Sequence, residues 1–251
     1  MENNQNLSNK ELHDLKKQEK TAGKEGQARK KKIKSISIWG GVLVLIIGSI
    51  WGLVSLVGNT EGNPPDTALL TDVVSERDWS LGSKTAGVVL IEYGDYQCPA
   101  CAAYHNFTKQ LVAEFGENIT FVYRHFPLRR IHPNTDISAQ AAEAAGKQGK
   151  FWEMHDLLFK NQNAWAKSLS AERIFVEYAA TLGLNTEQFK NDLDSDEIKD
   201  KINQDLASAE KANLPGTPSF FLNGQAIENP QSYDQFRILI TQARAAPIPA
   251  N

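Results

Sequence analysis

The sequence predicts an α/β domain that follows a single membrane-spanning helix, and three observations support this prediction. An uncharged, apolar run lies at 36–57. The only two cysteines of the 251-residue chain stand in a Cys-x-x-Cys motif between a strand pattern and a helix pattern. After residue 80, the predicted elements follow the order strand, helix, strand, long helical stretch, β-hairpin and final helix.

The cysteine pair predicts dithiol redox chemistry. Cys98 and Cys101 follow the apolar run 88–91 and open a helical pattern that extends over 102–115. A helix N-terminus stabilises a thiolate through free N–H groups and the positive end of the helix dipole. Pro99 fits the first turn, where a proline sacrifices no intrahelical hydrogen bond. We therefore expect Cys98 to be the exposed attacking thiol and Cys101 the resolving one.

Metal binding is the alternative reading of the same motif. A closed zinc site needs four ligands, and the chain has no third cysteine. His105, one turn beyond Cys101, is the only nearby histidine, and it otherwise reads as a helix-surface residue. A copper or zinc carrier that uses Cys98, Cys101 and His105 stays open as a minor hypothesis, because thiolates suit Cu(I).

Charge is distributed unevenly along the chain. Residues 1–35 carry ten Lys and Arg against five Asp and Glu, so this segment has a net charge of +5 and leaves −8 for the rest of a chain whose total is −3. A weakly acidic body argues against nucleic acid as a partner. The segment 1–35 is also polar and nearly free of large apolar residues, and we interpret it as a disordered tail.

The run 36–57 predicts a transmembrane anchor. As a helix it would span about 33 Å, enough for a bilayer core. Basic residues crowd its N-terminal side, and no Lys or Arg occurs between Lys34 and Arg77. The positive-inside rule then places the tail in the cytoplasm and the rest outside the cell membrane of a prokaryote. A cleaved signal peptide is the rival, but the basic segment is long and Leu56-Val57-Gly58 is a poor cleavage site.

Two smaller points follow from this topology. Gly48 and Gly52 form a Gly-x-x-x-Gly pair, a weak indication that two anchors pack together as a dimer. A chain whose only cysteines form one redox motif also suits an oxidising compartment, where a spare thiol would mispair.

The predicted organisation has four parts: a tail at 1–35, the anchor at 36–57, a linker at 58–80 and a folded domain at 81–246 with a helical insertion at about 134–212. The strands are expected at 88–93, 119–124, 219–222 and 225–227. The helices are expected at 102–115, 139–145, 151–159, 171–182, 186–193 and 197–212, with a last one from Ser232. Asn223-Gly224 is a strong hairpin turn signal between the last two strands.

Glu92 is the one charged residue in the strand 88–93. It reads either as a strand-end carboxylate turned to water or as a buried acid beneath the cysteine pair. A buried acid with a raised pKa could exchange a proton with Cys101. The pattern alone leaves both readings open.

Several motifs, in this order along residues 81–245, closely resemble the DsbA-like thiol–disulfide oxidoreductases, in particular their membrane-tethered branch. The motifs are Gly82-Ser83, Glu92-Tyr93-x-Asp95-Tyr96-Gln97-Cys98-Pro99-x-Cys101, Tyr123-Arg124-His125-Phe126-Pro127-Leu128, His132-Pro133, Ala144-Ala145-Gly146-x-Gln148-Gly149-Lys150-Phe151-Trp152 and Gly216-Thr217-Pro218-Ser219-Phe220-Phe221-Leu222-Asn223-Gly224. The resemblance implies a thioredoxin fold with an inserted helical domain and no cofactor.

The resemblance also implies roles for matching positions. Cys98 would be the nucleophile, Cys101 the resolving cysteine and Glu92 the buried acid of the family. Pro218 would be the cis-proline that faces the cysteine pair. Thr217 would present its backbone to the bound substrate chain by strand-like pairing.

The function implied by the resemblance is disulfide formation in newly secreted, cysteine-containing proteins, with reoxidation by a quinone-linked membrane partner. Ala100 is a departure, because the best-known strong oxidant of the family has histidine at this position. Its side chain offers the thiolate no charge or hydrogen bond, so an isomerase or reductase is the alternative. A binding module whose helical insertion grips apolar segments is a further one.

Overall fold

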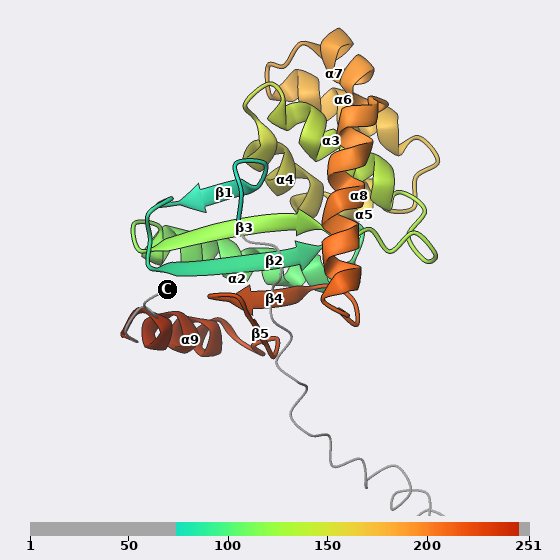
Figure 1. Cartoon of the computed structure of the whole chain (residues 1–251). Helices are drawn as coiled ribbons and strands as arrows, with labels where there is room; N and C mark the ends of the chain where they lie inside the picture. Colours follow the sequence, from blue (N-terminus) through green and yellow to red (C-terminus); the bar gives the residue numbers. More distant parts are fainter. Residues whose placement is uncertain (1–73, 246–251) are drawn as a thin grey trace, which may run out of the picture. The chain divides into compact units, whose positions relative to one another are not determined.

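The structure is a computed structural model that describes residues 74–245. In this part of the chain five strands form one mixed sheet in the order β1-β3-β2-β4-β5 (Figure 1). The strands are β1 (Trp79–Gly82), β2 (Val88–Gly94), β3 (Ile119–His125), β4 (Ser219–Leu222) and β5 (Gln225–Ile227). The central pair β2 and β3 is parallel, and the other neighbours are antiparallel.

Helices cover both faces of this sheet, as the alternation of side chains along β2 requires. Val88 and Leu90 pack in one cluster with residues of α2 (Pro99–Phe115) and α9 (Tyr233–Ala245). Ile91 and Tyr93 pack on the opposite face, in a cluster with residues of α8 (Asp196–Lys211). Accordingly, α8 crosses in front of the sheet in Figure 1, and α2 lies behind it.

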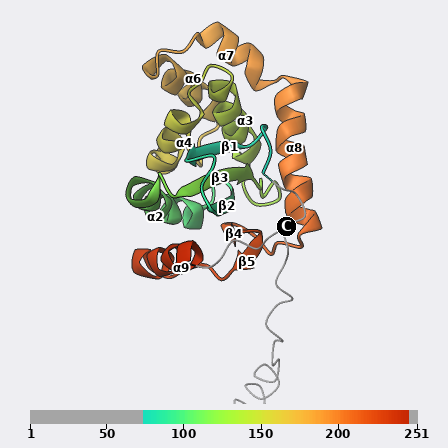
Figure 2. The ribbon, with the colours of Figure 1, turned by 60° about the vertical axis from the view of Figure 1, so that its left-hand side comes forward.

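The connection from β3 to β4 is entirely helical. It contains α3 (Thr135–Gly146), α4 (Phe151–Lys160), α5 (Gln162–Trp165), α6 (Ala171–Thr181), α7 (Thr186–Leu193) and finally α8. Helix α3 is rich in buried alanine, which lets α4, α6, α7 and α8 approach it closely (Figure 2). Large aromatic side chains, among them Phe151, Trp165 and Phe175, fill the core of this insertion.

Most predicted elements are present, with three corrections. Strand β1 includes Trp79 and Ser80, which the sequence predicts to lie in the linker. Helix α5 was not predicted, and α3 begins at Thr135 rather than at residue 139. The hairpin turn is as expected, because Asn223 and Gly224 have φ angles of 50° and 79°.

The predicted tail 1–35, the anchor 36–57 with Gly48 and Gly52, and most of the linker lie outside the described residues. Within residues 74–245, no helix is both long and apolar enough to cross a bilayer.

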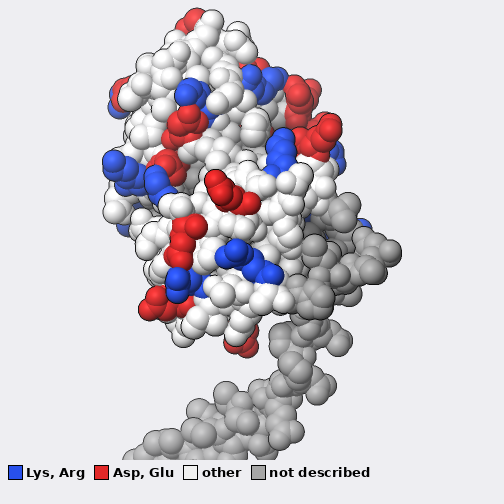
Figure 3. Space-filling view, turned by 90° about the vertical axis from the view of Figure 1, so that its left-hand side faces the viewer, with Lys and Arg blue, Asp and Glu red and all other residues white. Residues whose placement is uncertain are grey.

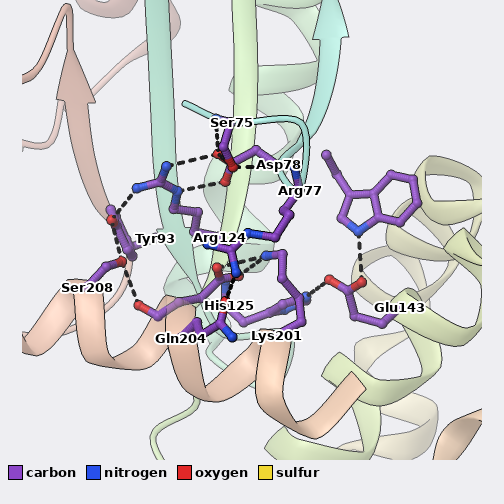
Figure 4. Close-up of polar contacts among 12 residues, drawn as sticks. Ser75, Arg77, Asp78, Tyr93, Arg124, His125, Glu143, Lys201, Gln204 and Ser208 are labelled. Carbon is purple, nitrogen blue, oxygen red and sulfur yellow. Dashed lines mark hydrogen bonds and ion pairs between the residues drawn. The ribbon is translucent and has the colours of Figure 1, made fainter. Parts of the chain in front are cut away.

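A buried ionic network fastens the segment before β1 to the sheet (Figure 4). Arg124 of β3 donates to the Asp78 carboxylate at 2.8 and 3.0 Å, and each of these side chains is 4% exposed. Arg124 also donates to the Tyr93 hydroxyl at 2.9 Å, which in turn bonds to Ser208 of α8 at 2.8 Å. Burial alone would raise the pKa of Asp78, but the bonds from Arg124 and the Ser75 backbone bring it below its ordinary value.

A second set of buried contacts joins β1, β3, α3 and α8. Glu143 accepts hydrogen bonds from the Trp79 indole at 2.9 Å and from His125 Nε2 at 2.8 Å. The backbone N–H of His125 donates to Asp205, whose carboxylate is paired with Lys201 (Figure 4).

On the outer surface shown in Figure 3, basic and acidic side chains are interspersed and form no extended patch of one sign.

Candidate redox site

The two cysteines lie at the start of α2. Cys98 is the N-cap residue, with φ −72° and ψ 122°, and Pro99 occupies the first turn. Both thiols are free. Cys98 is 7% exposed and Cys101 is 0% exposed. The prediction of an exposed Cys98 is therefore wrong, although Cys98 is still the more accessible of the two.

Distant segments cover Cys98. The peptide bond between Thr217 and Pro218 is cis, as predicted, and the Cys98 Sγ lies 3.5 Å from the Thr217 carbonyl oxygen. From α5, Gln162 Nε2 donates to the carbonyl oxygens of Tyr96 at 2.7 Å and Cys98 at 2.9 Å. Both the loop before β4 and the helical insertion thus contribute to the site.

The Cys98 thiol is strongly acidified. A hydrogen bond from the Cys101 thiol is the main cause, and burial opposes it. The backbone N–H groups of Cys101 and Ala100 add to the effect, and the pKa of Cys98 falls from 9.0 to about 5. Ala100 therefore stabilises the thiolate through its backbone, although its side chain offers nothing.

Cys101 behaves in the opposite way. Burial raises its pKa well above the ordinary value, and the hydrogen bond to Cys98 and the negative charge of Glu92 add to this effect. At neutral pH Cys98 is thus the thiolate and Cys101 the thiol, the protonation states that an attacking and a resolving cysteine would need.

Glu92 is buried beneath the pair, at 1% exposure, and is not a strand-end carboxylate in water. Burial raises its pKa from 4.5 to about 8, with a further contribution from the charge on Cys98. Its Oε1 has no hydrogen-bond partner among residues 74–245. The carboxyl therefore titrates close to neutral pH, as an acid that exchanges protons with Cys101 requires.

Asp95, for which the sequence predicts no role, organises the loop before the cysteines. Its carboxylate accepts from the backbone N–H of Gln97 at 2.7 Å and of Leu128 at 3.0 Å, and it pairs with His132 Nδ1 at 2.7 Å. Asp95 and His132 both belong to the motifs that carry the family resemblance, so the sequence could have indicated that they contribute to the site. Gln162 belongs to none of these motifs, so no sequence motif indicated its contribution.

The predicted metal site does not form. His105 is buried rather than on the helix surface, and its Nε2 pairs with the Asp156 carboxylate of α4 at 2.8 Å. In the described part of the chain, the group of side chains with metal-binding geometry is His105, His155 and Asp156, which includes neither cysteine. Since His105 faces α4, it does not converge with Cys98 and Cys101.

A low-pKa cysteine at a helix N-terminus, a buried resolving cysteine and a cis-proline loop against them define the class of protein. Together with the fold, they make the chain a thiol–disulfide oxidoreductase.

Comparison with known proteins agrees with this class. A family model described as Thioredoxin matches residues 75–242, and the chain belongs to the thioredoxin family. Among solved structures, it is similar to oxidised BdbD from Bacillus subtilis, with a TM-score of 0.64 and 21% identity over 72% of this chain and 100% of that one. A thioredoxin-like oxidoreductase from Silicibacter pomeroyi DSS-3 has a TM-score of 0.59 and 30% identity, and the match covers 72% of this chain and 98% of that one.

Curated relatives of similar sequence are named as antiporters, not as oxidoreductases. The chain is 35% identical over 191 residues, 76% of its length, to a protein of Salinispora arenicola named Na(+)/H(+) antiporter NhaA 1. A protein of Herminiimonas arsenicoxydans named Na(+)/H(+) antiporter NhaA is 39% identical over 159 residues, 63% of this chain. The matches span only 28% and 24% of those proteins, so they concern a part of each relative.

Proposed function

We propose that this protein is a membrane-anchored, extracytoplasmic oxidase that introduces disulfides into secreted proteins through Cys98 and Cys101. The observation that carries the proposal is the opposite direction of the two pKa shifts. The pKa of Cys98 falls to about 5, whereas that of Cys101 rises well above its ordinary value. A stabilised Cys98 thiolate favours the reduced enzyme, and a stable reduced form is what makes a disulfide a strong oxidant.

The reaction is a two-electron exchange. A substrate thiolate attacks Cys98 Sγ of the oxidised enzyme, the Cys98–Cys101 bond breaks, and Cys101 leaves and takes a proton, for which Glu92 is the nearby donor. A second substrate thiolate then attacks the substrate sulfur of the mixed disulfide. Cys98 leaves as a thiolate, the substrate has lost two electrons, and the enzyme has gained them.

The low pKa of Cys98 indicates the size of the effect. At pH 7, a thiolate with a pKa of about 5 instead of 9.0 stabilises the reduced form by on the order of 3 kcal/mol, equivalent to roughly 60 mV. This favours an oxidase over the isomerase or reductase that the Ala100 side chain suggests. A quinone-linked membrane partner would reoxidise the pair.

Location at a membrane rests on the sequence and on the relatives. The apolar run 36–57 and the basic residues before it support an anchor with the redox domain outside. The relatives named as antiporters match this chain over only 28% and 24% of their own lengths, and a redox domain that forms part of such a protein would be held at a membrane.

The test compares two single substitutions in cells. In Cys101→Ala the mixed disulfide has no internal thiolate to release it, so covalent adducts with proteins that carry export signals should accumulate. In Cys98→Ala few should form, because the remaining thiol is buried and its pKa is raised. Non-reducing gels after acid quenching, followed by identification of the adducts, provide the measurement.

The other outcomes distinguish the alternatives. Equal adduct levels from the two variants would contradict the roles of the cysteines, and cytoplasmic partners alone would contradict the location. Adducts that also form with an isomerase's substrates, namely proteins with already mispaired disulfides, would favour the isomerase. A binding module predicts that neither substitution produces adducts.

A further inference from the structure

A second group of chemically competent side chains lies between α2 and α4. His105 belongs to α2, and His155 and Asp156 belong to α4. One ligand atom from each of the three lies within 4.8 Å of the others, and His105 Nε2 is 2.8 Å from the Asp156 Oδ1. Two imidazoles and a carboxylate that converge to this degree match the donor set of a three-ligand zinc site.

The second histidine has a hydrogen-bond partner on one ring nitrogen. Its Nδ1 is 3.0 Å from the Tyr96 hydroxyl, so Nε2 is the nitrogen that a metal would take. Metal-binding histidines generally have such a partner on the second nitrogen.

The cluster is accessible from solvent. His105, His155 and Asp156 line a cavity of about 290 Å³. The Asp156 side chain is 40% exposed, whereas that of His105 is 9% exposed. An ion would therefore enter from the Asp156 side.

Lys109 is the present counter-ion of the carboxylate. Its ammonium group pairs with the Asp156 Oδ2, one turn along α2 from His105. The Lys109 side chain is 61% exposed, so it can turn into solvent and give up this position. A divalent cation would replace one positive charge with two at the same place.

We propose that His105, His155 and Asp156 form a zinc site, with a fourth coordination position open to the cavity. Imidazole nitrogen and carboxylate oxygen suit Zn²⁺, whereas Ca²⁺ and Mg²⁺ prefer sites made of oxygen alone. The ion would pin α4 of the helical insertion to α2, one turn beyond Cys101. Zinc would thus stabilise the contact between the insertion and the helix that carries the redox pair.

The test uses the full-length, metal-free protein with Cys98 and Cys101 oxidised to their disulfide, so that no thiolate is available. Zinc uptake is measured by competition with a chromophoric chelator, and Co²⁺ is used as a spectroscopic probe of tetrahedral nitrogen and oxygen ligation. We expect one ion per chain with a Kd of about 1 μM or tighter. His105→Gln and Asp156→Asn should each weaken binding by at least about tenfold.

Lys109→Gln and His132→Gln are the controls. Removal of the competing ammonium in Lys109→Gln should tighten zinc binding, whereas a weaker or unchanged affinity would contradict the site. His132→Gln removes a histidine outside the cluster and should leave the affinity unchanged. If the oxidised wild-type chain takes up no stoichiometric zinc, or if neither ligand substitution weakens uptake, the cluster is only a hydrogen-bonded contact between two helices. Thermal unfolding of each metal-free variant verifies that it is folded.

Discussion

Glu92 and Tyr93 are neighbours in β2, yet they face opposite sides of the sheet and meet opposite surroundings. Tyr93 points toward α8, where its hydroxyl bonds to Arg124 and Ser208. Glu92 points toward α2 and the cysteines, where its Oε1 has no partner among the described residues. Both residues are almost completely buried, at 0% and 1% exposure, so burial alone does not account for the difference.

Buried polar groups stabilise the fold on one face of the sheet, and on the other face a buried carboxyl is suited to proton transfer. On the α8 side, the charges are paired and hydrogen-bonded, as buried ionic groups need to be. On the α2 side, the Glu92 carboxyl is buried with no partner for its Oε1 among the described residues; burial lowers stability but raises the pKa of Glu92 to about 8. An acid that titrates near neutral pH can serve proton transfer, whereas a paired one would remain ionised.

The largest effect is expected from a substitution that breaks the buried ion pair on the α8 side of the sheet. Arg124→Met removes the cation beside Asp78 and leaves a buried carboxylate without its partner. Such a change should reduce the free energy of unfolding by about 3–5 kcal/mol. Urea titration at pH 7 measures it, and the exchange rate per folded molecule should change little because the cysteines lie on the other face.

A double variant identifies the cause. Asp78→Asn combined with Arg124→Met removes both charges and should recover a large part of the loss. Asp78→Asn alone is measured as well. If the loss of unfolding free energy in the double variant equals the sum of the losses in Asp78→Asn and Arg124→Met, the ion pair is not what holds this segment to β3.

The second largest effect is expected at Glu92, on the α2 side of the sheet, and there the substitution should raise the free energy of unfolding. Glu92→Gln should stabilise the oxidised protein at pH 7 by on the order of 3 kcal/mol, because the wild-type chain must keep a carboxyl protonated well above its unfolded pKa. Burial, the larger cause of the raised pKa, persists when Cys98 is in a disulfide. The same substitution should slow thiol–disulfide exchange by about tenfold or more, because Cys101 loses the carboxyl that donates its proton when the Cys98–Cys101 bond breaks.

The pH dependence gives the control for Glu92. Below pH 4.5 the carboxyl is protonated in both the folded and unfolded chains, and the two proteins should be equally stable. Between pH 4.5 and about 8 the unfolded chain loses this proton and the folded chain keeps it, so wild-type stability falls relative to the variant. A constant difference across this window would mean that Glu92 does not titrate as its surroundings require.

Local patterns explain which features could be predicted from the sequence. The buried run of β2, the hairpin turn at Asn223 and Gly224 and the position of Cys98 at a helix start all depend on residues close together in the chain. The cis peptide bond before Pro218 was predicted through the family resemblance. Strand β1 was missed because four residues that begin Trp-Ser-Leu show too little periodicity for a strand to be detected.

Burial and partners could not be predicted, because they depend on contacts between distant residues. Cys98 is covered by Gln162 and Thr217, which lie 64 and 119 positions away. His105 meets Asp156 at a separation of 51 positions, and no pattern in α2 indicates this contact. Sequence periodicity indicates which face of an element is apolar, but not which polar residue of another element will meet it.

The smallest effect gives the most controlled comparison, because the same atom is removed on each face. Tyr93→Phe removes a buried hydroxyl that has two partners and leaves Arg124 and Ser208 each short of one hydrogen bond. We expect a loss of about 1–3 kcal/mol in the free energy of unfolding. Tyr123, opposite Glu92 on the next strand, is also fully buried, but its hydroxyl has no partner among residues 74–245.

Tyr123→Phe should therefore be neutral or slightly stabilising, because an unpaired buried hydroxyl contributes a desolvation cost and no bond. The two variants lose the same oxygen from equally buried rings, so the difference between them measures the pairing alone. Chemical denaturation of both, side by side at pH 7, provides the measurement. Equal losses would show that Tyr123 has a partner in solution, such as water shared with Glu92, and that the α2 side of the sheet is hydrated rather than dry. In that case proton exchange between Glu92 and Cys101 would run through the same water, and Tyr123→Phe would slow thiol–disulfide exchange as well.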